Sequence, residues 1–503
     1  MMKKLLSIVM VIAMMASMFM VGTSAKAGDN DTWDGTVDIS WYDPTKVAFE
    51  ISTAEQLAGM AELSEMGLDF DGKTLLLTAD IVLNSGDAKT WETVAPANTW
   101  KKPIGTKNAP FRGVFDGQGH TVSGIYMSEA DNRDCYNIGL FGFIGAEYDY
   151  ATVKNLKVTN SYMVAFGKAG LIIGRMGENA KIENCFADGT VIAIEEYPST
   201  SGLFGANSHT GGVVGIIENA YDVVVDRCRF SGYVEGFCRT GAIVGSSSGT
   251  LITVKDCYSD ALVVGKNRIG GIFGHSNASL VEMVNCVFTG EINHSVYAKN
   301  YGAIMGGFRA QAASELIITD CYYDAVFKTI DKETNEYTVE LPAKVAVTEI
   351  GVMSEGSTWY TPMEDASQEP SGNDADGCEV EVTKAGAGAK EEFVTKLNAE
   401  VWDTATLTLK PIEVNEQDIS VIAPETTQAP ETTQAPETTQ APETTQAPTV
   451  DTTKAPETTK APTADTTKAP DTTEPAGGCG AIIGGGIVVT MAILGTAWVS
   501  KRR

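Results

Sequence analysis

The chain has 503 residues, including 51 glycines, and a formal net charge of −28 at pH 7. Nucleic acids and anionic membrane surfaces are bound by clustered Lys and Arg, so this charge argues against both as partners. The length permits several domains, but the glycine content and the short repeating patterns favour one elongated repeat structure with accessory segments.

Residues 1–27 have the layout of a secretory signal peptide. Two lysines precede an apolar run over residues 5–21, and small residues flank a cleavage site after Ala27. This layout predicts export of the mature chain, and an uncleaved membrane anchor is the alternative.

Residues 28–136 are expected to form an N-terminal cap and lead-in coils. Asp29, Asp31 and Asp34 suggest a calcium loop, but their spacing and the missing closing Glu do not fit an EF-hand. A strand is predicted over residues 37–50. The run STAEQ at 52–56 then offers a capping box to an amphipathic helix, which we expect to cover the first coil and protect its strand edge.

The next part of the chain repeats one short pattern: glycine, a small residue, an aliphatic residue, an apolar residue and glycine. It occurs as IGLFG (138–142, divergent), GLIIG (170–174), GGVVG (211–215), GAIVG (241–245), GGIFG (270–274) and GAIMG (302–306). The closing glycines lie 32, 41, 30, 29 and 32 residues apart. A period near thirty indicates a repeat architecture in which each unit stacks on its neighbours.

The spacing within each unit predicts short strands joined by bends. An apolar residue lies three places before a cysteine, which breaks the two-residue alternation of a straight strand, so a corner is expected between them. The residue before the cysteine is Asn184, Asp256, Asn285 or Asp320, types that tolerate left-handed backbone, with Arg227 as the exception. Further bends are expected after the cysteine, at 188–189, 231–232, 260–261, 289–290 and 324–325. Three strands and three bends per unit predict an all-β, three-sided parallel solenoid.

The cysteines of these units recur at one position of the repeat. We expect them to form an inward-facing ladder of free thiols, made of Cys185, Cys228, Cys257, Cys286 and Cys321. Rungs about 4.8 Å apart hold parallel side chains farther apart than the Cβ atoms of a disulfide. Disulfides, which export would favour, are the alternative.

The runs ISTAEQLAGMA, ADIVLN and FRGVFDGQGHTVSGIYM, followed by the glycine-bounded repeats, resemble the GLUG-motif surface proteins of mostly Gram-positive bacteria. The resemblance covers roughly residues 37–330, with GLUG-type repeats over 137–330. It implies a right-handed parallel β-helix and an extracellular role. It implies no activity, because such repeats occur beside adhesive modules and beside a zinc protease module, whose HExxH motif is absent here.

Two segments depart from the repeat. The 41-residue step contains an insertion near residues 195–208, a place where binding loops often sit on rigid repeats, although a neutral insertion is the alternative. Residues 331–422 are expected to be C-terminal coils and a cap. They include GNDADG, which resembles part of a calcium loop, and a helical pattern over 390–401 that we expect to close the far end.

The C-terminal part has the composition of a stalk followed by a membrane anchor. Residues 423–475 contain four ETTQAP copies and form the predicted disordered Thr/Pro-rich stalk. Residues 476–503 are a predicted transmembrane anchor, because 481–499 carry no charge and a basic tail follows. Processing near Cys479, as in three-part sorting signals, is the alternative, and no LPxTG motif precedes the span.

Catalytic signals are sparse in this sequence. His120, His209, His275 and His294 lack metal-ligand spacing, and no GxSxG, Walker or GxGxxG motif occurs. His120 beside Asp116 is one acid/base candidate, with a tight turn as the alternative interpretation. Glu195, Glu196 and Tyr197 on the insertion are another, with a solvated loop as the alternative. We therefore predict no catalytic, metal or cofactor site.

The sequence favours a non-catalytic adhesion or binding protein at the cell surface, held in the membrane by a C-terminal helix and facing an extracellular glycan or protein surface. A cell-attached polysaccharide lyase or glycoside hydrolase is the first alternative, and a structural spacer the second. An aromatic strip on the solenoid would favour binding, whereas carboxylates clustered in a cleft would favour an enzyme.

Overall fold

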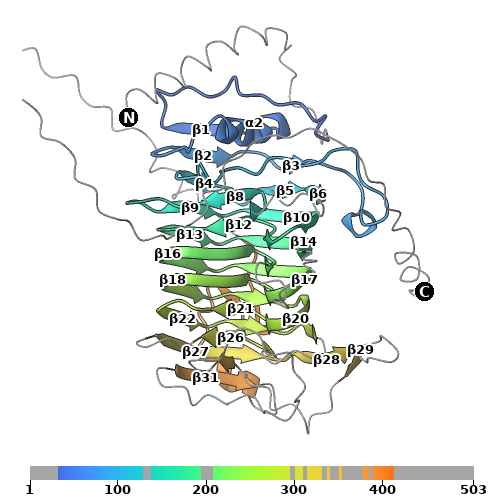
Figure 1. Ribbon diagram of the computed structural model, residues 1–503, viewed down its shortest axis with the longest axis vertical. Coiled ribbons are helices and arrows are strands. Elements are labelled where there is room, and N and C mark those ends of the chain that lie inside the picture. The colour runs from blue at the N-terminus through green and yellow to red at the C-terminus, as the bar shows by residue number, and fades with distance from the viewer. Residues whose placement is uncertain are drawn as a thin grey trace, which may run out of the picture. The chain divides into compact units, whose positions relative to one another are not determined.

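A computed structural model describes residues 32–128, 137–193, 208–294, 301–309, 314–330, 337–339, 350–353, 378–384 and 389–412. Within them, one large sheet of parallel strands winds around a continuous apolar core, as predicted for an all-β solenoid (Figure 1). A single pairing in this sheet, between β28 (Val326–Ile330) and β29 (Tyr337–Val339), is antiparallel.

The strands fall into three columns, and in each column a strand pairs with its counterpart one coil later. The first column is β1 (Ala48–Ile51), β2 (Thr74–Leu77), β4 (Val114–Asp116), β9 (Ala151–Lys154), β13 (Ala180–Glu183), β16 (Val214–Asp226), β18 (Val244–Lys255), β22 (Leu280–Val284), β27 (Glu315–Tyr323) and β31 (Cys378–Lys384). The second column is β3 (Ile81–Val82), β5 (Thr121–Ser123), β6 (Tyr126–Ser128), β10 (Lys157–Ala165), β14 (Phe186–Ala193), β17 (Arg229–Gly241), β19 (Tyr258–Ser259), β20 (Leu262–Gly270), β23 (Val287–Phe288), β24 (Glu291–His294) and β28, together with the end of β27. The third column is β7 (Asn137–Ile138), β8 (Phe141–Ile144), β11 (Lys168–Ala169), β12 (Ile173–Met176), β15 (His209–Gly211), β21 (Phe273–Ser276), β25 (Tyr301–Gly302), β26 (Met305–Arg309) and β30 (Ile350–Met353), together with parts of β16, β17, β18 and β20.

The corner before the cysteine is confirmed. Asn184, Asp256, Asn285 and Asp320 have φ between 50° and 53°, in the left-handed region. Arg227 has φ of 50° as well, so it is an exception in residue type and not in conformation. After the cysteine, the strands are interrupted at the predicted bends 260–261, 289–290 and 324–325, whereas β14 and β17 continue as paired strands through 188–189 and 231–232.

The cysteine ladder is also present. All five cysteines are free and buried, and their thiols lie near main-chain carbonyls of the preceding coil, as Cys257 Sγ does at 3.7 Å from the oxygen of Val225. Burial raises the pKa of the Cys257 and Cys321 thiols, which keeps them neutral. Cys238, in β17, is a sixth buried free cysteine outside the ladder.

The predicted N-terminal helix is α2 (Ala54–Glu65), and it lies beside β1 at the N-terminal end of the stack (Figure 1). Thr53, the N-cap residue, accepts a hydrogen bond from the Gln56 backbone, as the predicted capping box requires. The Gln56 side chain accepts its hydrogen bond from the backbone of Ser52 at 2.9 Å, one residue before the N-cap position that a capping box uses. Leu57 and Met60 are fully buried in the solenoid core. A short 3₁₀ helix, η1 (Ala88–Thr90), follows in the lead-in region.

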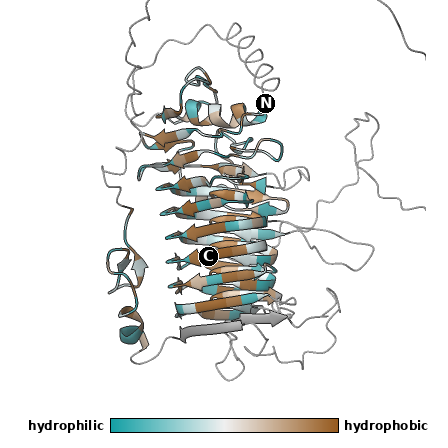
Figure 2. Cartoon of the chain, turned by 90° about the vertical axis from the view of Figure 1, so that its left-hand side faces the viewer, coloured by the Kyte–Doolittle hydropathy of each residue, from teal (hydrophilic) through white to brown (hydrophobic). Residues whose placement is uncertain are grey.

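The predicted C-terminal cap lies elsewhere than expected. The helix α3 (Ala389–Val394) and the hairpin of β32 (Trp402–Asp403) and β33 (Thr408–Leu409) pack against the side of the stack, where they contact Tyr258, Val287 and Tyr322. Figure 2 shows this segment beside the rungs. The prediction that it closes the far end is therefore wrong, because its apolar residues meet side chains that point outward from three successive rungs.

The predicted signal peptide, the predicted stalk and the C-terminal apolar span lie outside the described residues. So do Asp29, Asp31, the insertion up to residue 207, and the GNDADG run. Among the residues that are described, no helix is long and apolar enough to cross a membrane.

Candidate functional site

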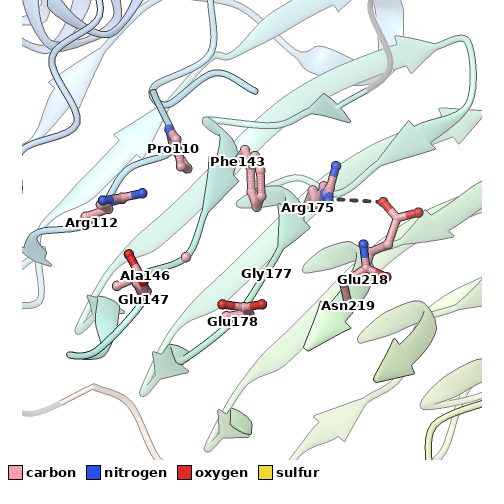
Figure 3. A pocket seen from close by; sticks show the side chains of 11 residues that line it. Pro110, Arg112, Phe143, Ala146, Glu147, Arg175, Gly177, Glu178, Glu218 and Asn219 are labelled. Atoms are coloured by element: carbon pink, nitrogen blue, oxygen red, sulfur yellow. Dashed lines mark ion pairs between the residues drawn. The ribbon is translucent and has the colours of Figure 1, made fainter. Parts of the chain in front are cut away.

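A shallow groove of about 310 Å³ crosses four successive rungs at one side of the solenoid (Figure 3). The strands β8, β12 and β16 place its central side chains, because Phe143 pairs in register with Arg175, and Glu218 lies on the next strand. Its lining residues are Pro110, Arg112, Phe143, Gly145, Ala146, Glu147, Arg175, Gly177, Glu178, Glu218 and Asn219.

The floor of the groove depends on a missing side chain. A Cβ atom on Gly177 would lie 2.8 Å from Cε2 of Phe143. The phenyl ring therefore fits in this position because the residue on the next rung is glycine. The Arg175 guanidinium lies 4.2 Å from the centroid of that ring, a cation–π arrangement. Phe143 is therefore held as a fixed apolar platform within a polar groove.

Glu218 is held as a carboxylate. Its Oε2 lies 2.7 Å from Nζ of Lys168 and 3.3 Å from Nε of Arg175. Burial raises the pKa of Glu218, but the hydrogen bond from Lys168 and the charge of Arg175 outweigh burial, so the net pKa is lowered. A carboxylate in this state accepts hydrogen bonds and does not serve as a general acid at neutral pH.

Three exposed tyrosines are close in sequence to residues that line the groove. Tyr148, Tyr221 and Tyr150 are 85%, 66% and 41% exposed, and among the described residues no other aromatic side chain is comparably exposed. Tyr148 and Tyr150 follow β8, next to the lining residue Glu147, and Tyr221 lies two residues after the lining residue Asn219. The Tyr150 hydroxyl donates to the Asp222 carboxylate, which raises the pKa of Tyr150 to about 12.

The register gives the spacing of these tyrosines. Ala151 pairs with Ala180, and Ala180 with Val223, so the segment before Ala151 and the segment before Val223 are two rungs apart. Two rungs correspond to roughly 10 Å along the solenoid axis. Tyr148 and Tyr150 on one segment and Tyr221 on the other therefore mark two points along that axis.

Comparison with protein-family models, curated proteins and solved structures finds no match to this chain. The likeness to GLUG-motif proteins consequently stays an expectation from the residues quoted above.

The structure separates the acid/base candidates His120 and Asp116 into different hydrogen-bond pairs. Asp116 is buried and accepts hydrogen bonds from the Gln118 backbone and the Asn155 side chain, at 2.9 and 3.0 Å. His120 instead places Nδ1 3.2 Å from the Asp80 carboxylate. Gln118 has φ of 49°, and the His120 backbone donates to Gly117 at 2.8 Å, so the tight-turn interpretation holds.

The structure brings His209 to Ser246, a pair that sequence reasoning did not find. Nδ1 of His209 lies 2.5 Å from the Ser246 hydroxyl oxygen, and Nε2 lies 3.2 Å from Nη1 of Arg239. Arginine has only donors, so Nε2 must accept and Nδ1 must carry the proton that is shared with Ser246. In this tautomer the imidazole cannot take the serine proton, so the pair does not activate a nucleophile.

The remaining candidates contribute no metal site within the described residues. Asp34 accepts hydrogen bonds from Thr36, and these lower its pKa, as in a local turn. No group of three His, Cys, Asp or Glu side chains in the described part of the chain could hold a metal ion. Glu195, Glu196 and Tyr197 lie outside that part.

Proposed function

We propose that this chain is a cell-surface binding protein whose tyrosine-rimmed groove holds an extended extracellular glycan without cleaving it. In this proposal the signal peptide exports the chain, the stalk raises the solenoid, and the C-terminal helix anchors it in the membrane. The solenoid winds in the right-handed sense that the resemblance implies.

The observation that carries the proposal is the clustering of exposed tyrosines at the groove. Exposed aromatic rings are an unfavourable way to face water, and a group of them beside a concave surface marks an interaction site. Tyrosine offers a flat apolar face for the carbon-bound hydrogens of a sugar ring and a hydroxyl for its polar edge. Glu147, Glu178 and Asn219 in the groove supply hydrogen-bonding groups for sugar hydroxyls.

The spacing favours a polymer over a single sugar. Tyr148 and Tyr221 belong to segments two rungs apart, or roughly 10 Å, which is close to the length of a disaccharide. The groove is open and crosses the rungs, and Glu147 and Asn219, which line it, adjoin the two tyrosine segments in sequence, so a linear glycan that lies along the axis could reach both segments. Repeats of this kind offer binding area more than an enclosed pocket.

A glycan-cleaving enzyme is the second candidate, because Glu147 and Glu178 line the same groove. Glycoside hydrolysis uses two carboxyl groups, one of them protonated as a general acid. Glu218 is unsuited to that role because Lys168 and Arg175 lower its pKa. This leaves Glu147 and Glu178 as the pair to test.

The proposal is tested by electrophoresis of the full-length chain in native gels cast with soluble polysaccharides of different linkage. At least one polysaccharide should retard the wild-type protein, and Tyr148→Ala/Tyr221→Ala should migrate as it does in an empty gel. Val37→Ala, also at an exposed apolar side chain, is the matched control and should be retarded like wild type. Retardation of none of the panel, or equal retardation of the tyrosine variant, would contradict the proposal.

The same polysaccharides decide between binding and cleavage. After prolonged incubation with the wild-type chain, the binding proposal predicts no new reducing ends or unsaturated products. Their release, abolished by Glu147→Gln or Glu178→Gln, would replace this proposal with the enzyme.

A further inference from the structure

The segment 389–412 forms a small structure of its own on the side of the solenoid. Phe393, Leu397, Trp402, Leu407 and Leu409 are buried in an apolar cluster separate from the main core. The partners that the solenoid contributes to this cluster are Tyr258, Val287 and Tyr322. These three residues pair in register, so the segment spans three successive rungs.

Specific polar contacts fix the position of the segment. The Trp402 indole donates to Oδ1 of Asp256 at 3.2 Å, and its ring lies 6.4 Å from that of Tyr258, edge to face. Two rungs later, Lys396 Nζ lies 2.6 Å from Oδ1 of Asp320. Asp256 and Asp320 are themselves corner residues with left-handed backbone, so the contacts are made to the corners of the rungs.

The order of these contacts shows that the chain turns back along the stack. Phe393 packs on Tyr322, with ring centroids 5.1 Å apart, and Trp402 packs on the earlier rung of Tyr258. The chain therefore leaves the solenoid from its side, two rungs before Tyr322. Any pull from the C-terminal direction reaches the Trp402 contact before it reaches β31.

We propose that residues 389–412 are a latch that fastens three rungs near the C-terminal end of the solenoid, those of Tyr258, Val287 and Tyr322, and receives tension from the C-terminal chain before β31 does. A solenoid is stabilised only by contacts between neighbouring coils, so its terminal coils open most easily. A segment that binds three rungs at once makes their separate opening cooperative. The latch rests on these contacts and is independent of what the groove binds.

The cysteine ladder provides a test of the latch. Cys257, Cys286 and Cys321 immediately precede Tyr258, Val287 and Tyr322, and all three thiols are buried. In the full-length chain, Trp402→Ala should increase the native-state labelling rates of these three thiols with a small thiol reagent by about tenfold or more, because local opening limits the reaction. Cys185 and Cys228, on earlier rungs, should be labelled at wild-type rates.

A milder variant and a matched control keep the test decisive. Lys396→Met removes the ion pair with Asp320 and should accelerate the labelling of Cys321 most. Trp91→Ala removes a buried tryptophan that packs near Tyr162 instead, and should leave Cys257, Cys286 and Cys321 unchanged. Unchanged rates in both latch variants, or equal acceleration of all five ladder thiols, would overturn the proposal.

Mechanical pulling tests the second half of the proposal. The full-length chain is stretched between handles at its two ends in optical tweezers. The first extension step should occur at a lower force in Trp402→Ala than in the wild type or in Trp91→Ala. An unchanged force for the first step would show that tension does not pass through the latch.

Discussion

The ring of Phe230 occupies the space that a side chain on Gly212 would need: a Cβ atom there would lie 2.3 Å from Cγ of Phe230. Gly271 stands in the same relation to Phe288, at 2.4 Å from Cδ1. One coil later the register places Ala242 at the position of Gly212 and Ser259 at the position of Phe230. The coil of Ala303 differs, because Tyr323 takes the position of Phe288 there. In the coils of Gly212 and Gly271, the missing side chain is thus matched by a phenylalanine ring in the same coil.

This match predicts that Gly212→Ala is destabilising. The added methyl group collides with Phe230 and with the carbonyl oxygen of Ala242, and overpacking of this kind costs about 1–3 kcal/mol. Urea unfolding monitored by circular dichroism measures the loss. In a chain that also carries Phe230→Ser, Gly212→Ala should cost less free energy of unfolding than it does in the wild type. Strictly additive effects of the two substitutions would contradict the size match.

The corner residues of neighbouring rungs are hydrogen-bonded to each other, and this predicts that Asn184→Ala destabilises the fold more than Asn184→Gly does. Its side-chain amide donates to Oδ1 of Asn155 one rung earlier at 2.8 Å, and its φ is 52°. Asn184→Ala loses the hydrogen bond and forces alanine, which has no side-chain polar group to stabilise it, into left-handed backbone. Together these effects should lower the free energy of unfolding by about 2–3 kcal/mol. Asn184→Gly loses mainly the hydrogen bond, at about 1 kcal/mol. Equal losses in the two variants, compared by thermal unfolding, would show that the backbone conformation is not limiting.

The thiol ladder predicts the redox state of the protein. Protein denatured without reductant should react with a thiol reagent at Cys185, Cys228, Cys257, Cys286 and Cys321, as peptide mass spectrometry can establish. The reason is geometric: successive rungs hold these residues about 4.8 Å apart, beyond the usual Cβ separation of a disulfide. A ladder found almost entirely blocked before reduction would contradict this account.

Burial of His209 predicts a loss of stability in acid. Burial, and next the charges of Arg239, Lys168 and Arg268, lower the pKa of His209 well below 6.5. In the unfolded chain His209 takes up a proton near pH 6.5, whereas in the folded chain it stays neutral. The free energy of unfolding is therefore fully retained above pH 6.5 and falls as the pH drops below it. The wild type should therefore lose up to about 1.4 kcal/mol more per pH unit than His209→Gln between pH 6.5 and 5. Parallel stability profiles for the two proteins would contradict the shift.

Local sequence rules were sufficient for the solenoid because its geometry is repeated. The apolar residue three places before each cysteine predicted a corner, and the neighbouring rungs impose that corner even on Arg227, whose side chain does not favour it. The side-on position of residues 389–412 could not be predicted in this way. It depends on a contact between Trp402 and Asp256, which lie 146 positions apart and share no repeat pattern.

The candidate site was only partly accessible from sequence. Tyr148 and Tyr150 lie between predicted strands, outside the core pattern, and this was an available signal for exposed aromatic residues. Their proximity to the segment of Tyr221 follows only from the register of β9, β13 and β16. The contact of His209 with Ser246 likewise depends on how the coils stack, which the spacing of the histidines alone does not reveal.

The measurement that tests the central claim most directly is the dependence of affinity on glycan length. Fluorescently labelled oligosaccharides of increasing length, cut from a retained polysaccharide, are titrated with the full-length chain, and their lengths are determined again afterwards. Affinity should rise until the oligosaccharide spans the two rungs between the segments of Tyr148 and Tyr221, and every oligosaccharide should remain intact. A monosaccharide that binds as tightly as the longest oligosaccharide, or shortening of the ligand, would contradict an extended, non-catalytic binding site.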